Sequence, residues 1–445
     1  MKTKLITTFL ILAATVFPLQ VGAAPKLPAA PKALSQARFD VRDFGAKGDG
    51  VSDDTKAVQD AIDACRNGTV VLSPGIYRTR MIVLHSDMEL HLEEGAVIKA
   101  TDLQEHFPLM KVESDNINWG KGRSARAFIF ALQSHDIRIT GPGTIDGNGY
   151  APAWDGLREG GRPIPIYLAQ CERVLLDNFL LKDGAMWNIV PYETDDFTMR
   201  RVRIDANIVE NRDGIDIVDC HRVLVEDCVF YTDDDCICPK SGHRRGVRDV
   251  TVRRCRIEKC GRANGIKFGT MSRGGFQDML FEDITLSDVR LSGIAVESVD
   301  GANIKNLIFR NITMDRVGNP IFIIRGLRNT EKAGFVKGLR FENIKATLTT
   351  RPWGGVIAGT GKNLVKNVVF KDLDITFMGG LKEVPSTPPE YDGRYPECNM
   401  WGNSPAAGFY FRHVRGIRLT GCKIRTESPD ARTLFVTEDA SVKGL

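Results

Sequence analysis

The chain has 445 residues, of which 42% are hydrophobic and 26% are charged, and its formal net charge is +4. This composition is that of a globular protein and excludes a collagen-like chain, a disordered chain and a multi-span membrane protein. Basic pairs such as Arg200–Arg201 and Arg253–Arg254 lie scattered among acidic residues, so the charge does not predict a nucleic-acid partner.

The first residues carry a targeting pattern. Two lysines precede an apolar run from Leu5 to Phe17, and a stretch of small residues ends at Ala24. This order predicts a secretory signal peptide over residues 1–23, cleaved near Ala23 or Ala24. No later segment approaches the ~18 uninterrupted apolar residues of a membrane span. We therefore expect a secreted or periplasmic protein with no membrane contact after cleavage.

Residues 24–38 are rich in proline and alanine and are predicted to be a linker, and residues 39–445 are predicted to form a single domain. Near the start of that domain, Ser52 or Asp53 is predicted to cap an amphipathic helix. Its apolar stripe comprises Val58, Ala61, Ile62 and Cys65. Such a helix would cover the exposed edge of the first strands.

A short alternating pattern recurs along most of the domain. It begins at Val174, Phe197, Val223, Val250, Met279, Leu307, Leu339, Val368 and Ile417. Until the last copy, the starts lie roughly 23 to 32 residues apart, a spacing typical of solenoids. Alternation with a period of two, with β-branched and aromatic residues at the apolar positions, indicates strands. The predicted fold class is therefore all-β. It is a parallel β-helix with an N-terminal capping helix, and its coils stack ~4.8 Å apart.

Ten cysteines in an exported chain permit disulfides. The spacing of Cys236, Cys238, Cys255 and Cys260 also raises zinc binding, but no paired histidines accompany it, so no metal is expected. Cys228 occupies the same register position as Cys255 one coil later. We expect these two thiols to stack in the core, with a disulfide as the alternative.

Two acidic clusters lie one coil apart, in Asn211–Asp216 and Thr232–Cys236. Stacking would bring Asp213 beside Asp235, and carboxylates this close repel unless they are solvated, protonated or bound to a cation. Asp234 and Asp235 would point to opposite sides of a regular strand. Both can therefore reach one site only if the chain turns there.

Hydrolysis of a glycosidic bond needs one carboxylic acid to protonate the leaving oxygen and one carboxylate to activate water or attack. Clustering suits this need, because repulsion raises the pKa of one member and keeps its proton available. A separation of about 6.5–9.5 Å between the two groups would predict inversion of the anomeric configuration.

The chain resembles the polygalacturonase family of pectin-degrading enzymes, glycoside hydrolase family 28. The resemblance rests on an ordered series of motifs: FGAKGDGVSDDTKA, GPGTIDGNG, NRDGID, TDDDCICPKSG, CGRANGIKFGT and RYPECNMWGNSPAAGFYFRHV. It implies a right-handed parallel β-helix, inverting hydrolysis without a cofactor, and a polysaccharide or oligosaccharide substrate. It also implies that Asp234 is the general acid, that Asp213 and Asp235 activate water, and that a disulfide joins Cys236 to Cys260.

The departures from the family pattern concern the substrate. Asn264 replaces the family's histidine, and Ala295 and Glu297 replace the arginine and lysine that grip a galacturonate carboxylate. A glutamate should repel a uronate, so a neutral or differently charged sugar fits this position better than plain polygalacturonan does.

The remaining residues expected to bind substrate fall into two groups. Asn211 belongs to the first acidic motif, and Lys240, Lys267 and Arg325 are candidate partners for anionic groups nearby. His243 is a candidate to replace part of the missing histidine's role. The long excursion from Gly379 to Pro405 is expected to wall off one end of the groove.

Two other functions stay open on the sequence alone. A lyase or epimerase would need carboxylates that bind Ca²⁺ and a basic residue that abstracts a proton. A noncatalytic carbohydrate-binding β-helix would explain the missing histidine, arginine and lysine. The protein is expected to be a monomer.

Overall fold

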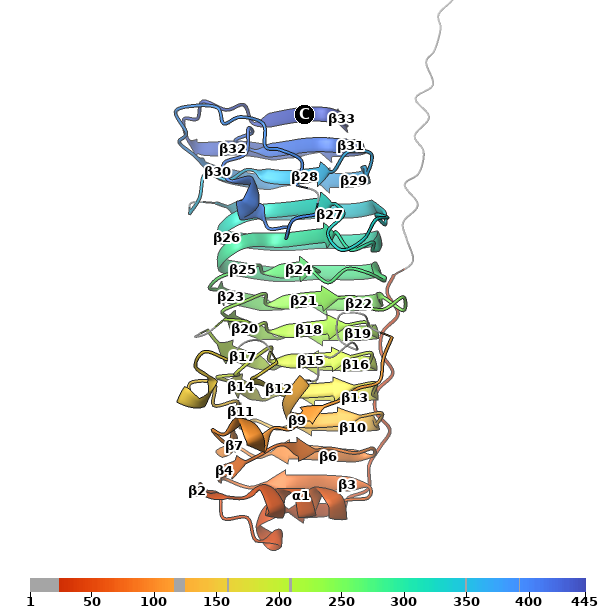
Figure 1. Cartoon of the computed structure of the whole chain (residues 1–445), viewed down its shortest axis with the longest axis vertical. Helices are drawn as coiled ribbons and strands as arrows, with labels where there is room; N and C mark the ends of the chain where they lie inside the picture. The colour runs from red at the N-terminus through yellow and green to blue at the C-terminus, as the bar shows by residue number, and fades with distance from the viewer. Residues whose placement is uncertain (1–23, 116–124, 158–159, 208–209, 349, 392) are drawn as a thin grey trace, which may run out of the picture.

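The computed structural model describes residues 24–115, 125–157, 160–207, 210–348, 350–391 and 393–445. Its strands pair in parallel, coil above coil, in one long solenoid (Figure 1), so the predicted parallel β-helix is confirmed. The predicted signal peptide, residues 1–23, lies outside the described residues. Within the described ranges, no helix is long and apolar enough to cross a membrane.

The solenoid has three faces, which we name A, B and C in the order that the chain visits them in each coil. Face A contains β1 Arg38–Asp40, β3 Gly68–Leu72, β6 Met88–Leu92, β10 His135–Thr140, β13 Glu172–Asp177, β16 Asp195–Arg200, β19 His221–Glu226, β22 Val247–Arg253 and β29 Val365–Lys371. Face B contains β2 Asp49–Asp53, β4 Gly75–Thr79, β7 Ala96–Ala100, β11 Thr144–Asp146, β14 Leu180–Lys182, β17 Arg203–Ala206, β20 Val229–Thr232, β23 Arg256–Cys260, β30 Asp374–Gly379 and β32 Lys423–Ser428. Face C contains β5 Ile82–Val83, β9 Ala125–Leu132, β12 Pro163–Ala169, β15 Ile189–Tyr192, β18 Ile215–Val218, β21 Ile237–Lys240, β24 Ile266–Phe268 and β28 Gly355–Gly359.

Five longer strands bend around the corners between faces: β25 Gly275–Ser298, β26 Asn303–Arg325, β27 Val336–Thr347, β31 Phe409–Thr420 and β33 Phe435–Lys443. The short β8 Leu109–Met110 pairs with β9 in the antiparallel sense. The 3₁₀ turns are η1 Val41–Phe44, η2 Gln104–His106, η3 Pro152–Trp154 and η4 Cys398–Trp401.

The predicted repeats stack in register on face A. Val174 pairs with Phe197, and the pairing continues coil by coil through Leu307 and Leu339 to Val368. The apolar positions point inward, and phenylalanines at equivalent positions form a stacked column. Ring centroids are 4.9 Å apart between Phe309 and Phe341. The column reflects a register set by the sequence period. A shift of one residue in the pairing of two strands would turn every inward side chain outward.

The first coil is covered by α1 (Thr55–Ala64), which lies at the end of the solenoid in Figure 1. Its predicted apolar stripe is buried. The helix begins later than predicted, because Ser52 and Asp53 belong to β2. Asp54 is the residue before the helix, and its carboxylate accepts bonds from the backbone amides of Lys47 and Gly48 instead of capping the helix.

Residues 24–37, within the predicted linker, lie along the side of the coils as an extended strap (Figure 1). The backbone amides of Lys26, Ala29 and Lys32 donate to the carboxylates of Asp249, Asp196 and Asp136 at 3.0, 2.9 and 2.8 Å. The backbone amide of Ser35 then donates to the side chain of Asn67 at 2.9 Å. Each step of three residues along the strap therefore crosses two coils.

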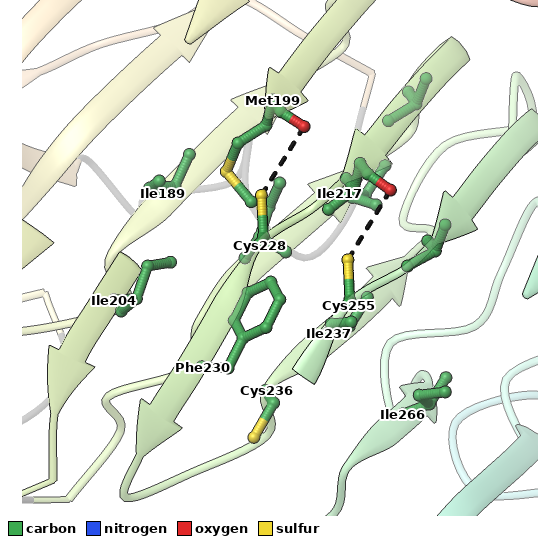
Figure 2. Close-up of a cluster of buried hydrophobic side chains, with 14 of the residues drawn as sticks. Ile189, Met199, Ile204, Ile217, Cys228, Phe230, Cys236, Ile237, Cys255 and Ile266 are labelled. Atoms are coloured by element: carbon green, nitrogen blue, oxygen red, sulfur yellow. Dashed lines mark hydrogen bonds between the residues drawn. The ribbon is translucent and has the colours of Figure 1, made fainter. Parts of the chain in front are cut away.

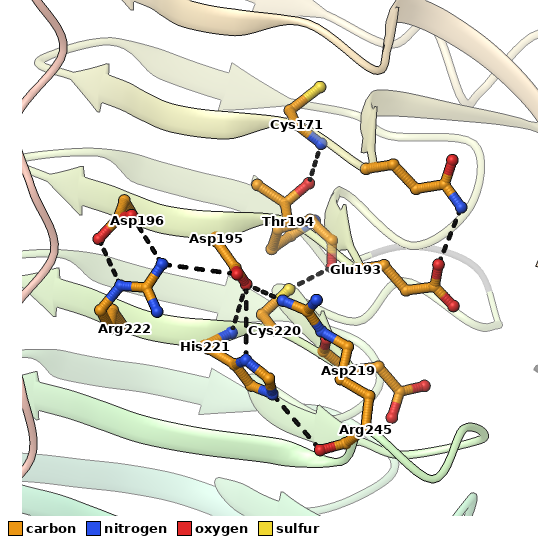
Figure 3. A network of polar contacts seen from close by, with 12 residues as sticks. Cys171, Glu193, Thr194, Asp195, Asp196, Asp219, Cys220, His221, Arg222 and Arg245 are labelled. Atoms are coloured by element: carbon orange, nitrogen blue, oxygen red, sulfur yellow. Dashed lines mark hydrogen bonds and ion pairs between the residues drawn. The ribbon is translucent and has the colours of Figure 1, made fainter.

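This match follows from two repeat distances. Pro25, Pro28 and Pro31 recur every third residue and favour the polyproline II conformation. One turn of that helix has three residues and rises ~9.3 Å, whereas two coil spacings measure ~9.6 Å. The acceptors are themselves held in place, since Asp196 also pairs with Arg222 (Figure 3) and Asp136 with Arg173.

The interior also contains the predicted thiol pair. Cys228 and Cys255 lie on neighbouring coils in matching register (Figure 2), which confirms that they stack. Both are buried free thiols, and their sulfurs donate to the backbone carbonyls of Glu226 and Arg253 at 3.2 and 3.4 Å. The alternative of a disulfide between them is therefore wrong.

Candidate active site

The two acidic motifs form the turns that enter face C on neighbouring coils. Ile215 of β18 pairs with Ile237 of β21, which places Asp213 over Asp235 as predicted. Gly214 makes this stacking possible, because a Cβ there would lie 2.2 Å from the carbonyl oxygen of Cys236. The backbone amide of Gly214 instead donates to the carbonyl of Asp235 at 2.9 Å.

The chain turns between β20 and β21, so Asp234 and Asp235 reach the same site. The backbone amide of Asp235 donates to the side chain of Asp234 at 3.0 Å, and the Thr232 hydroxyl donates to the carbonyl of Asp234 at 2.7 Å. One carboxylate oxygen from each of Asp213, Asp234 and Asp235 lies within 4.8 Å of the others. The three predicted catalytic acids therefore form one cluster, closer together than the spacing that by itself predicts inversion.

Asp235 has the strongest positive surroundings of the three. Its carboxylate lies 3.2 Å from the ammonium group of Lys267 and accepts two bonds from Asn264, at 2.9 Å from the side-chain amide and 3.0 Å from the backbone. Burial alone would raise its pKa, but Lys267, Lys240 and the Asn264 bonds outweigh burial and lower it. Asp235 is thus held as a carboxylate.

Asp234 and Asp213 titrate in the other direction. Burial and the neighbouring charge of Asp235 raise the pKa of Asp234 to about 6. Burial, followed by the charges of Asp216 and Asp234, raises the pKa of Asp213 well above its usual range. The cluster therefore holds a protonated carboxyl beside an ionised one, the pair that acid–base catalysis needs.

Lys240 lies at the carboxyl end of β21 and neutralises the deeper acids. Its ammonium group is 3.4 Å from Asp213 and 3.1 Å from Asp216, and it lies 4.8 Å from the centre of the Trp187 ring. All three side chains are buried, and burial raises the pKa of Asp216 to about 7. Lys240 is thus part of the cluster, with its charge already paired.

Glu397 is a member of the cluster that the sequence analysis did not single out. It comes from the excursion between β30 and β31, and its carboxylate lies 2.6 Å from the ammonium of Lys267. It also accepts a bond of 3.1 Å from the side-chain amide of Asn264. The only hint in the sequence is an acid within the RYPEC motif, because no periodic pattern relates it to face C.

Glu297 also belongs to this region. It is fully buried, and neither of its carboxyl oxygens forms a hydrogen bond of ordinary length with the described residues. Burial raises its pKa well above the usual range, even though the charge of Lys267 opposes the shift. Glu297 is therefore held as a neutral acid.

Three other predicted residues lie at the margin or elsewhere. Asn211 accepts a bond of 2.9 Å from Arg162 beside the first acidic turn. Arg325 donates to the carbonyl of Leu364 at 2.8 Å, and no contact joins it to the acidic cluster within the described part of the chain. His243 lies in the loop after β21, where its ring faces Asp115 at 3.7 Å, so it does not take the place of the missing histidine.

The predicted disulfide between Cys236 and Cys260 is not formed, and both residues are free, buried thiols. Each sulfur has a backbone partner instead. Cys260 donates to the carbonyl of Asp234 at 3.3 Å, and Cys236 to that of Lys259 at 3.7 Å. The two thiols lie next to each other, as the resemblance implied, but they satisfy their hydrogen-bonding capacity without a covalent link.

The oxygen ligands of Asp213, Asp234 and Asp235 are also of the type that Ca²⁺ prefers. Here, however, the ammonium groups of Lys240 and Lys267 already compensate the acidic charge at 3.4 and 3.2 Å. Two fixed cations beside the carboxylates would repel a metal ion. The arrangement therefore suits proton transfer better than metal binding.

Comparisons with known proteins agree with this geometry. Residues 111–388 match the family described as Glycosyl hydrolases family 28, and residues 38–107 match the one described as Rhamnogalacturonase A/epimerase, pectate lyase-like. A probable polygalacturonase from Vitis vinifera is 30% identical over 293 residues, which cover 60% of this chain and 57% of that protein. A probable endo-xylogalacturonan hydrolase A from Emericella nidulans is 27% identical over 271 residues, covering 58% and 62% respectively.

Among solved structures, the family 28 exopolygalacturonase of Yersinia enterocolitica superimposes with a TM-score of 0.70 at 19% identity, covering 92% of this chain and 79% of that one. This likeness shows a shared fold. The chain spans 57%, 61% and 63% of the length of the first three curated relatives.

Proposed function

Because the chain belongs to glycosyl hydrolase family 28, we propose that it hydrolyses glycosidic bonds in a pectic polysaccharide by inverting acid–base catalysis. The observation that carries this proposal is the meeting of three carboxyl groups within 4.8 Å on neighbouring coils, with the Lys267 ammonium 3.2 Å from Asp235. Asp234 has a pKa raised to about 6, and Asp235 has a lowered pKa. One group can donate a proton while the other accepts one.

In the proposed reaction, Asp234 protonates the oxygen of the leaving sugar as the glycosidic bond breaks. Asp235 accepts a proton from a water molecule as that water attacks the anomeric carbon. Asp213, stacked on Asp235, orients this water. The carboxylate of Asp235 then holds the proton that the water has lost, and the new hydroxyl takes the opposite configuration. The stereochemistry rests on this division of roles and on the family resemblance, since the carboxyl spacing alone does not predict it.

For the substrate, we propose a neutral sugar at the position beside Asp235 and Lys267. Glu297 and Ala295 replace the cations expected to grip a uronate there, and Lys267 lies between two carboxylates. Neutral residues in a pectic backbone or side chain include rhamnose, galactose and arabinose.

The test is the release of reducing ends from polygalacturonan, rhamnogalacturonan, galactan and arabinan. We expect cleavage of a polymer other than polygalacturonan, and its loss by several orders of magnitude in Asp234→Asn. The control is Asp372→Asn, the same change at an exposed turn residue. Polygalacturonan as the sole substrate would refute the proposed neutral sugar, and activity retained in Asp234→Asn would refute the proposed acid.

We also propose that the protein is exported, to the periplasm or the medium. The order of basic, apolar and small residues before Ala24 supports this. The amino-terminal sequence of protein recovered outside the cytoplasm should begin near Ala23 or Ala24. Recovery of the full-length chain from the cytoplasm alone would contradict the proposal.

A further inference from the structure

Glu397 shares both of its partners with Asp235. Lys267 lies 3.2 Å from Asp235 and 2.6 Å from Glu397. The side-chain amide of Asn264 donates to Asp235 at 2.9 Å and to Glu397 at 3.1 Å. A residue 130 positions along the chain from Lys267 therefore completes the immediate surroundings of Asp235.

The excursion holds Glu397 firmly at this place. Cys398 and Trp401 of η4 are buried in an apolar cluster with Ala295 and Phe322 of face C. On the other side, the Tyr395 ring lies 5.3 Å from the Lys267 ammonium and 5.5 Å from the Arg328 guanidinium. The Glu397 side chain is only 14% exposed. Its contact with Lys267 is thus built into the fold.

The charges around Lys267 determine what can bind beside it. Its single positive charge faces the carboxyl groups of Asp235 and Glu397, and the neutral Glu297 adds no cation. Burial raises the pKa of Glu397, and the Lys267 ammonium 2.6 Å away opposes that shift. A uronate entering this place would meet two carboxylates and a lysine that is already paired. A neutral sugar brings no charge, and its hydroxyl groups can donate hydrogen bonds to these carboxyl groups.

We propose that Glu397 is a specificity-determining and positioning residue, which occupies Lys267 and so reserves the site beside Asp235 for a neutral sugar. This inference rests on the proposed function and names the side chain that sets its substrate class. Glu397 also keeps Lys267 and Asn264 in place against Asp235. It therefore influences the base without contacting the reacting atoms.

The first experiment measures binding by calorimetry at low salt, with a galacturonate oligosaccharide and a neutral galactose oligosaccharide as probes. Glu397→Gln should bind the uronate probe at least tenfold more tightly than the unaltered protein does, with little change for the neutral probe. The control is Glu383→Gln, the same change at an exposed residue of the same excursion. An unchanged preference between the probes, or no uronate binding by Glu397→Gln, would overturn the inference.

A double variant guards against an indirect effect of altered folding. If the freed Lys267 causes the gain, Glu397→Gln combined with Lys267→Met should return uronate affinity to that of the unaltered protein. A gain that persists in the double variant would overturn the inference.

The pH dependence of the rate separates this positioning role from a purely structural one. Glu397→Gln leaves Lys267 to Asp235 alone, so the acidic limb of the pH–rate profile should shift to lower pH. Glu397→Asp, which retains the charge, should keep the preference for the neutral probe. If the unaltered protein cleaves no polymer, the proposed function fails, while the binding experiment still tests Glu397.

Discussion

Asp234 and Asp235 are neighbours in sequence with opposite electrostatic surroundings. Asp235 lies against Lys267 and Asn264, whereas Asp234 gains its raised pKa from burial and from the charge of Asp235 itself. Lys267 and Asn264 on the next coil, together with Lys240, thus lower the pKa of Asp235. A histidine is not required to separate the two protonation states.

This asymmetry predicts the pH dependence of catalysis. The acid must be protonated, so kcat/KM should fall as pH rises through about 6, the pKa of Asp234. The base must be ionised, so activity should persist into the acid until pH falls below the usual pKa of an aspartic acid, because the pKa of Asp235 is lowered. Initial rates between pH 3 and 9 would check this profile. Activity that rises steadily above pH 7 would contradict the assignment.

At the residue scale, the sequence predicted the acids but only part of their surroundings. Asp213 and Asp235 could be placed together because their spacing equals one coil. Glu397 could not be placed, because it reaches the site through an irregular excursion whose path depends on the packing of Trp401. Free thiols at Cys236 and Cys260 were also beyond prediction, since a sequence match carries the positions of two sulfurs and not their bonding.

At the element scale, the strap of residues 24–37 connects coils that are distant in sequence. Its backbone amides donate to carboxylates near the starts of three face A strands, β10, β16 and β22, and so connect the coils between them. The stacked coils otherwise contact only their neighbours, so such a tie opposes local separation. The composition indicated an extended segment, but the match between its three-residue period and two coils emerged only from the structure.

A chain that begins at residue 37 should be less stable and still fold. The loss of these hydrogen bonds is worth about 2–4 kcal/mol in total, which should lower Tm by several °C. Activity at 25 °C should be retained, because the strap and the acidic cluster contact different faces. Calorimetry of this chain would measure the effect, with Leu27→Ala, at a 55% exposed side chain, as the control. A Tm unchanged within 1 °C would show that the strap does not stabilise the coils.

At the scale of the whole molecule, the period of the repeats determined the fold. A strand pattern that recurs once in each coil places every strand beside the equivalent strands of the neighbouring coils, and it pairs with those. The predicted strands and the capping helix followed from this period. The loops between faces carry no such period, and they hold much of the site. The fold was thus more predictable than the completed site.

Buried carboxyl groups across the coils predict how stability depends on pH. Burial raises the pKa of Asp216 to about 7 and of Asp219 to about 6, so these groups stabilise the fold below their unfolded pKa, near 4. That contribution is lost progressively as pH rises from about 4 to 7, because the unfolded chain releases these protons near pH 4 while the folded chain still holds them. Conversely, bonds from His91 and Arg432 lower the pKa of Glu89 and Asp430, respectively, to about 2, a contribution lost as pH falls below about 4.

We therefore expect Tm to be highest near pH 4, to fall as pH rises from about 4 to 7, and to fall again below about pH 4. Thermal unfolding followed by circular dichroism across pH 3–9 would test this. A Tm that does not fall between pH 4 and 7 would contradict the raised pKa values of these buried carboxyl groups.

The central claim is that Asp234 donates the proton to the leaving sugar. The most direct test compares Asp234→Asn with the unaltered enzyme on two substrates of the same sugar, the natural glycan and an aryl glycoside with a dinitrophenol leaving group. Dinitrophenolate leaves without protonation, so the variant should lose several orders of magnitude in kcat on the glycan and far less on the aryl glycoside. An equal loss on both substrates would contradict the assignment of Asp234 as the general acid.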